Sequence, residues 1–214
     1  MNRFDAGQGR LASTRAPNFR HAATRFAAVL ALAMFASAGS AGETLHIRTQ
    51  AGDPHERLAA QQLQHLVEEY DVQRWIYTRD VLIDKEAIPH SHPVLTLDLG
   101  APDDEQVQLA SFLHEQFHWY LDTKGESVSG AMKAFEHMFP DAPSGKGAGA
   151  RDRQSTYLHL IVCDLEFQAM TRLVSEKRAR DLLGGWRHYT WIYEQVLGNP
   201  QVRRINAEFG LLLP

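Results

Sequence analysis

The stretch SFLHEQFHWY (Ser111–Tyr120) places two histidines one helical turn apart, with a glutamate directly after the first. Together His114, Glu115 and His118 form the pattern H-E-x-x-H. In an α-helix, residues i and i+4 share one face and lie about 6 Å apart along the axis. Two imidazoles at this separation can bind one Zn²⁺, and the adjacent carboxylate can reach a water molecule bound to the ion. The stretch therefore predicts a helix that carries a hydrolytic metal site.

The residues around the motif predict that this helix is buried. Phe112, Leu113 and Phe117 surround the two histidines with apolar side chains. The alternative, an amphipathic helix with histidines near its surface, fits these neighbours poorly. A buried Glu115 needs a partner, and a metal-bound water is one. Its expected role is that of a general base, which accepts a proton from that water and passes it to the leaving amine.

A catalytic zinc site takes three protein ligands, so a third ligand must come from elsewhere in the chain. The apolar segment YLHLIVCDLEFQAM (residues 157–170) contains Glu166, whose neighbours three and four positions away cannot pair with it. A carboxylate in such a segment is costly unless a group outside its helix satisfies it, so Glu166 is the predicted third ligand. The alternatives are a pair with a distant arginine and a buried acid that is satisfied by hydrogen bonds. His159, two turns earlier on nearly the same face, and Asp164, which points about 200° away from Glu166, are the rival ligands.

HEQFH on one helix, followed by a carboxylate within a later apolar helix, resembles the gluzincin branch of zinc metallopeptidases. The resemblance spans about residues 94–166 and implies a zincin-like α+β fold in which Glu166 completes the ligand set with His114 and His118. It also implies that a strand at 94–99 offers an open edge to the substrate backbone. One position departs from the family: many gluzincins place an aspartate four residues after the ligand glutamate, where this chain has Met170.

The same resemblance implies a histidine or tyrosine, beyond the third ligand, that stabilises the oxyanion. The segment WRHYTWIY (residues 186–193) offers His188, Tyr189 and Tyr193 on one predicted helix. His188 is the predicted donor, with a purely structural histidine as the alternative. Tyr193 is the second candidate, although an aromatic residue in this helix also suits the core.

Hydrophobic patterning and end signals predict the class α+β, with a small N-terminal sheet that has an edge strand, followed by a mostly helical part. The predicted strands cover residues 44–49, one or two segments within 72–84, and 92–100. The predicted helices cover residues 53–70, 101–125, 130–139, 153–183 and 186–198.

The first 41 residues predict a signal peptide. Five arginines precede an apolar run at 26–38, and small residues follow, with a cleavage site after Ala38 or Ala41. The apolar run is shorter than the roughly 20 residues that span a bilayer, so no stable membrane insertion is expected after cleavage. A buried N-terminal helix and an uncleaved anchor are the alternatives. The expected organisation is a signal peptide (1–41) and one zincin-like domain (42–214) that is exported to the periplasm or secreted.

The amino-acid composition limits the classes of binding partner that this chain is expected to have. The formal charge is -4, and no stripe dense in lysine and arginine is present, which argues against nucleic-acid binding. Cys163 is the single cysteine, so no internal disulfide can form. The sequence predicts a peptidase that holds one Zn²⁺ per chain and acts on a peptide or protein substrate. The alternatives are a catalytically inactive metal-binding or peptide-binding module with a degenerate peptidase fold, and a helical binding domain without metal.

Overall fold

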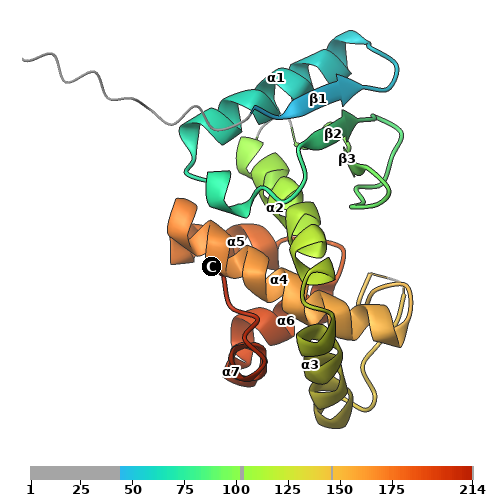
Figure 1. Ribbon diagram of the computed structural model, residues 1–214, viewed down its shortest axis with the longest axis vertical. Coiled ribbons are helices and arrows are strands. Elements are labelled where there is room, and N and C mark those ends of the chain that lie inside the picture. The colour runs from blue at the N-terminus through green and yellow to red at the C-terminus, as the bar shows by residue number, and fades with distance from the viewer. Residues whose placement is uncertain (1–43, 102–103, 146, 214) are drawn as a thin grey trace, which may run out of the picture. The chain divides into compact units, whose positions relative to one another are not determined.

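The computed structural model describes residues 44–101, 104–145 and 147–213, and the predicted signal peptide lies outside them. Three strands and seven α-helices make up this part of the chain (Figure 1). In chain order they are β1 (His46–Thr49), α1 (Pro54–Glu69), the 3-10 helix η1 (Gln73–Trp75), β2 (Asp80–Ile83), β3 (Leu95–Leu97), α2 (Glu105–Asp122), α3 (Gly125–Met138), α4 (Arg153–Leu173), α5 (Glu176–Gly184), α6 (Thr190–Gly198) and α7 (Pro200–Glu208).

The predicted α+β class is confirmed. The strands form a parallel sheet in the order β1-β2-β3, with Ile47 opposite Val81 and Val81 opposite Leu95. Helix α1 connects the first two strands and packs on both of them. Among the described helices, none is long and apolar enough to cross a membrane.

Strand β3 lies at an edge of the sheet, but this edge is not open along its whole length. The chain turns back after β2, and His90 pairs with Thr96 of β3 in an antiparallel bridge. The Thr96 N–H donates to the His90 carbonyl at 2.8 Å, and the His90 N–H donates to the Thr96 carbonyl at 3.0 Å. The expectation of an open edge over 94–99 is therefore wrong at Thr96, since its backbone groups are already satisfied.

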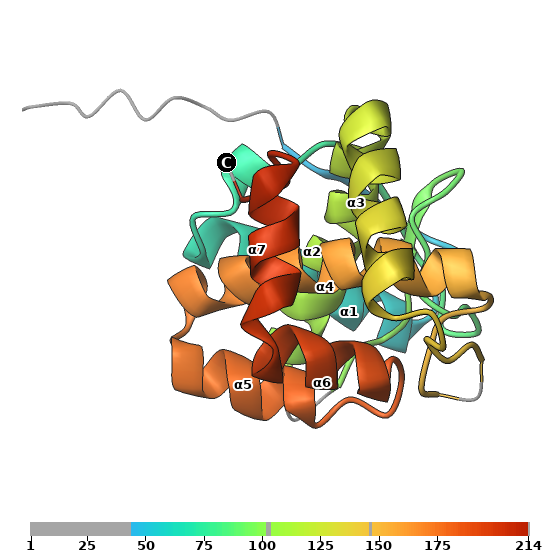
Figure 2. The ribbon, with the colours of Figure 1, turned by 90° about the horizontal axis from the view of Figure 1, so that it is seen from below.

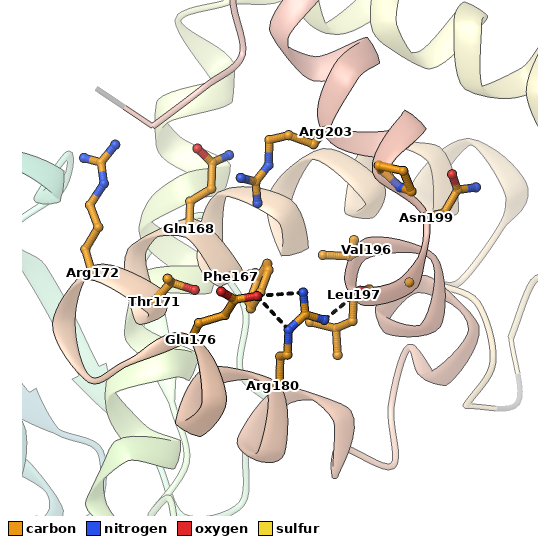
Figure 3. A pocket seen from close by; sticks show the side chains of 12 residues that line it. Phe167, Gln168, Thr171, Arg172, Glu176, Arg180, Val196, Leu197, Asn199 and Arg203 are labelled. Atoms are coloured by element: carbon orange, nitrogen blue, oxygen red, sulfur yellow. Dashed lines mark hydrogen bonds and ion pairs between the residues drawn. The ribbon is translucent and has the colours of Figure 1, made fainter.

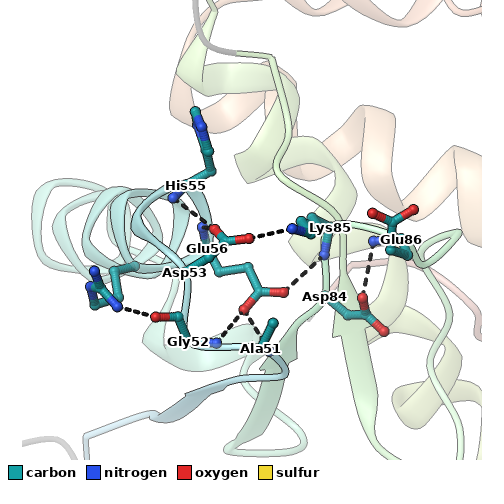
Figure 4. A network of polar contacts seen from close by, with 9 residues as sticks. Ala51, Gly52, Asp53, His55, Glu56, Asp84, Lys85 and Glu86 are labelled. Atoms are coloured by element: carbon teal, nitrogen blue, oxygen red, sulfur yellow. Dashed lines mark hydrogen bonds and ion pairs between the residues drawn. The ribbon is translucent and has the colours of Figure 1, made fainter.

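A buried carboxylate fixes the start of α1 against the end of β2 (Figure 4). Glu56 Oε2 accepts the N–H groups of Ala51 and Gly52, each at 2.8 Å, and its Oε1 accepts the Lys85 N–H at 3.3 Å. Asp53 caps α1 by accepting the N–H groups of the next helical turn, as its position before a proline predicts. These contacts hold the turn between β1 and α1 in one conformation.

Helices α2 and α4 form the centre of the helical part. Figure 1 shows α2 running from β3 across α4, and both contacts are present in the structure. Figure 2 shows α4 behind α3 and α7, which both pack on it. Every residue of α2 from Gln108 to Phe117 is buried. The side-chain amide of Gln116 bonds the backbone of residues 77–78, and Gln108 donates to the Ala59 carbonyl, so α2 is held from two sides.

The helix boundaries depart from the predictions at two places that shape the site. The helix predicted over 153–183 is two helices, because Ser175 ends α4 and caps α5 by accepting the Arg178 N–H. The helix predicted from Trp186 begins only at Thr190, so His188 and Tyr189 belong to a loop.

Candidate metal centre

Three histidines from two helices converge in the interior. His114 and His118 lie on α2, and His159 lies on α4; their ligand atoms are all within 4.8 Å of one another. Ring centroids are 5.3 Å apart for His114 and His118, 5.4 Å for His114 and His159, and 5.0 Å for His118 and His159. The H-E-x-x-H motif is thus joined by a third imidazole at the spacing that one cation requires.

In His114 and His159, a hydrogen bond at Nδ1 leaves the other ring nitrogen, Nε2, available to a cation. Nδ1 of His114 is 3.0 Å from Glu166 Oε2, and Nδ1 of His159 is 2.7 Å from the Ser155 carbonyl oxygen. A carboxylate or carbonyl acceptor at Nδ1 fixes the proton there, so the lone pair resides on Nε2. This is the arrangement that metal-binding imidazoles in proteins adopt.

Glu166, the predicted third ligand, does not belong to the three-histidine group. It is fully buried, and its Oε2 accepts hydrogen bonds from His114 Nδ1 and, at 2.7 Å, from the Tyr193 hydroxyl. Its carboxylate groups with His114 and Cys163 and does not join the set that contains His118. The geometry therefore favours His159 over Glu166 as the third ligand, and places Glu166 where it orients His114.

The other rival, Asp164, takes part in a separate contact. Its Oδ1 accepts from Arg203 Nε at 2.6 Å, and its Oδ2 accepts from Asn206 at 2.9 Å. Both partners come from α7, so this buried carboxylate attaches α7 to α4. Asp164 is thus oriented away from the three histidines.

Burial sets the protonation of the histidine cluster. Burial, together with the neighbouring imidazoles, lowers the pKa of His118 well below its usual value and lowers the pKa of His159 to about 4. Both rings are therefore neutral at physiological pH and can offer a lone pair to a cation. Burial also opposes protonation of His114, but contacts with Cys163 and Glu166 outweigh it and raise the pKa of this ring.

Glu115 faces the same cleft as His114. Its side chain is 5% exposed, and no described residue donates a hydrogen bond to its carboxylate. Burial is the main cause that raises the pKa of Glu115 above the usual range for a carboxyl group. A carboxylate in this state is a stronger base than one in water, and its oxygens are free to bind a solvent molecule.

The cleft has a volume of about 350 Å³. Ser111, His114 and Glu115 of α2 line it, together with residues of the glycine-rich loop from Gly145 and Gly147 to Arg151. Residues of the segments at 88–89 and 98–101 and of the loop before α6 also line it. Among these residues, the apolar Ile88 is 85% exposed.

Tyr189, one of the groups that the segment 186–193 offers, lies beside the three histidines. Its ring stacks on His114 with an interplanar angle of 7° and lies 4.5 Å from His159, centroid to centroid. Its φ of 57° is in the left-handed region, which is unfavourable for a residue with a bulky side chain. The next two residues, Thr190 and Trp191, donate their N–H groups to the carbonyls of Gly147 and Ala148, and these bonds hold the loop in place.

The predicted oxyanion donors occupy different environments. His188 is exposed at the cleft, in the loop before α6. Tyr193 is buried in α6, and its hydroxyl is committed to Glu166. Both residues line the cleft, but the Tyr193 hydroxyl contacts Glu166, which in turn contacts His114.

A second hollow, of about 580 Å³, lies among α4, α5, α6 and α7 (Figure 3). The guanidinium groups of Arg180 and Arg203 lie over the ring of Phe167, at 5.1 and 5.9 Å from its centroid. Arg180 is paired with Glu176 and with the Leu197 carbonyl. None of the three histidines lines this hollow, so it is separate from the metal centre.

The residues present fit a zinc ion. Three imidazoles, one of which lines a cleft, are the donor set of a catalytic zinc site, and the buried carboxylate of Glu115 lines the same cleft. No family model, curated protein or solved structure matches this chain.

Proposed function

We propose that this chain is an exported, zinc-dependent peptidase with a zincin-like site. The observation that carries the proposal is the convergence of His114, His118 and His159, of which His114 lines the same cleft as Glu115. The H-E-x-x-H motif supports it, as does the sequence of residues 1–41, which has the features of an export signal.

The three histidines would hold the ion. Zn²⁺ in such a site acts as a Lewis acid that polarises a carbonyl and lowers the pKa of water to about 7. Glu115 takes the proton of the attacking water, because its carboxylate is buried, free of donors and directed at the cleft. It then returns that proton to the nitrogen of the leaving amine.

Tyr189 is the donor best placed for the developing oxyanion. Its ring stacks on one ligand imidazole and lies against another, and no described residue bonds its hydroxyl. The backbone bonds of Thr190 and Trp191 fix its position before substrate arrives. His188, at the same cleft, is the second candidate donor.

The substrate of this proposal is an extended peptide segment. Beyond the bridge at Thr96, Asp98 and Gly100 carry the chain after β3 along the cleft. This leaves the end of the strand, and not its centre, as the place where a peptide backbone can pair. The cleft volume of about 350 Å³ suits a few residues, and Ile88, Val107 and Trp186 provide apolar contacts for their side chains.

The test is Glu115→Gln, compared with Glu136→Gln on the exposed surface of α3. The first variant binds as much zinc as the wild type and loses peptide hydrolysis by at least about 10²-fold, since the base is gone and the ligands remain. The second variant matches the wild type in both measurements. Retained hydrolysis in Glu115→Gln overturns the mechanism. Bound zinc with no hydrolysis in the wild type, across a library of peptides, shows an inactive metal-binding module instead.

A further inference from the structure

We infer that His114, Cys163 and Glu166 form a second metal site, suited to a thiophilic divalent cation such as Cd²⁺ or Zn²⁺, behind the three-histidine centre. One ligand atom from each residue lies within 4.8 Å of the other two. The site shares only the His114 ring with the proposed catalytic centre, and it uses the Nδ1 side of that ring.

The donors of this second site are positioned by the same two helices. Cys163 and Glu166 are three residues apart on α4 and therefore lie on one face, opposite His114 of α2. Cys163 and Glu166 are fully buried, and His114 is 7% exposed. The Cys163 thiol faces both His114 and the Tyr193 hydroxyl. Sulfur, nitrogen and carboxylate oxygen together make a donor set for zinc or a softer cation.

Glu166 has coordinating capacity that the protein leaves unused. Its Oε2 accepts two hydrogen bonds, whereas its Oε1 is buried and has no partner among the described residues. A buried carboxylate oxygen without a donor costs free energy, typically about 1–3 kcal/mol. A cation at this position would satisfy the oxygen.

The charge balance also favours a divalent ion. With Nε2 of His114 held in the three-histidine centre, binding there requires two protons to leave, one from the Cys163 thiol and one from Nδ1 of His114, whose ring would then bridge the two sites. One divalent cation replaces two protons, so the net charge of this buried cluster does not change. The exchange therefore avoids the large penalty of introducing an uncompensated charge into the interior.

The single cysteine makes a specific test possible. Metal-free full-length protein is titrated with Cd²⁺, and bound cadmium is counted while the thiolate-to-cadmium charge-transfer band is followed in the ultraviolet. Because the chain has one cysteine, any such band reports Cys163. The wild type is expected to bind two equivalents, one of which produces the band.

Two variants separate the sites. Cys163→Ala should bind one equivalent without the band, and His159→Ala should bind one equivalent with it. Cys163→Ser repeats the first test with a polar residue of similar size, and circular dichroism checks folding. The wild-type band alone decides the proposal if a variant fails to fold. One equivalent and no band in the wild type overturns the second site and leaves the peptidase proposal intact. A band with one equivalent, unaffected by His159→Ala, supports the second site and contradicts the three-histidine centre.

Discussion

Nδ1 of His114 lies 3.0 Å from Oε2 of Glu166, and this contact defines the role of both residues. The carboxylate fixes the tautomer and the orientation of the ring, so that Nε2 is the nitrogen left for a cation. His159 then completes the set with His118. Glu166, predicted as a ligand from its unpaired position in an apolar segment, instead hydrogen-bonds the His114 ring.

Removing Glu166 should weaken metal binding without abolishing it. Glu166→Ala takes away the acceptor at His114 Nδ1, and loss of such a contact typically weakens metal affinity about 10- to 100-fold. His159→Ala removes a ligand and should cause a larger loss. Competition with a chromophoric chelator measures both, and exposed His137→Ala is the control. If Glu166→Ala binds no zinc while His159→Ala binds normally, the ligand assignment is wrong.

Tyr193 should contribute to metal binding through Glu166. Tyr193→Phe removes the donor 2.7 Å from Oε2 and should lower the free energy of unfolding by about 2 kcal/mol, as expected for a hydrogen bond to a charged group. It should also weaken zinc binding several-fold. Tyr157→Phe is the matched control, because the Tyr157 hydroxyl donates at 2.9 Å to the Phe139 carbonyl, away from the histidine cluster. Denaturant unfolding should show a loss of about 1 kcal/mol for that variant, with unchanged zinc affinity. Equal zinc affinities in the two variants would contradict this coupling.

Tyr189 should matter for turnover and not for metal content. Tyr189→Phe keeps the stacking on His114 and removes the hydroxyl, so kcat should fall by about 10²–10³-fold with little change in KM. His188→Ala, at the exposed rim of the same cleft, should reduce kcat far less. Steady-state kinetics on a peptide substrate, with zinc analysis of each variant, makes the comparison. The reverse order of effects would assign the donor role to His188.

The Asp53–Lys85 pair should make stability depend on pH. The hydrogen bond to Lys85, followed by the backbone N–H of Glu56, lowers the pKa of Asp53 from 3.8 to about 2. Because the folded-state pKa is the lower one, the ionised carboxylate stabilises the fold above pH 3.8. This contribution is lost as the pH falls through about 2.

Asp53→Asn keeps a capping side chain and removes the charge. The difference in unfolding free energy between wild type and Asp53→Asn should therefore be present at neutral pH and shrink below pH 3.8. Denaturant titrations at a series of pH values measure it. A difference that stays constant down to pH 2 would contradict the lowered pKa.

The sequence predicted the parts of the site that depend on local spacing. The helical position of His114, Glu115 and His118 follows from the motif, and burial follows from the apolar residues between them. The sequence around His159 and Glu166 could not decide which of the two is the third candidate ligand. These residues are two turns apart on one face of α4, and only the packing of α4 on α2 decides which reaches the cation and which reaches the back of His114.

Two other features depended on contacts between distant segments. Tyr189 adopts a left-handed conformation because the loop at 147–148 holds the residues that follow it, and propensity favoured a continuous helix there. The outer edge of β3 is occupied because the chain after β2 returns to pair His90 with Thr96. Neither pairing leaves a signal within a window of a few residues.

The most direct test of the three-histidine centre is anomalous diffraction at the zinc edge, from crystals grown with one equivalent of Zn²⁺. We expect one peak at about 2.0–2.1 Å from a ring nitrogen of each of His114, His118 and His159, with Glu166 bonded to His114 and not to the ion. A peak that is coordinated by the Glu166 carboxylate in place of His159, or no peak among the three imidazoles, would contradict the proposed centre.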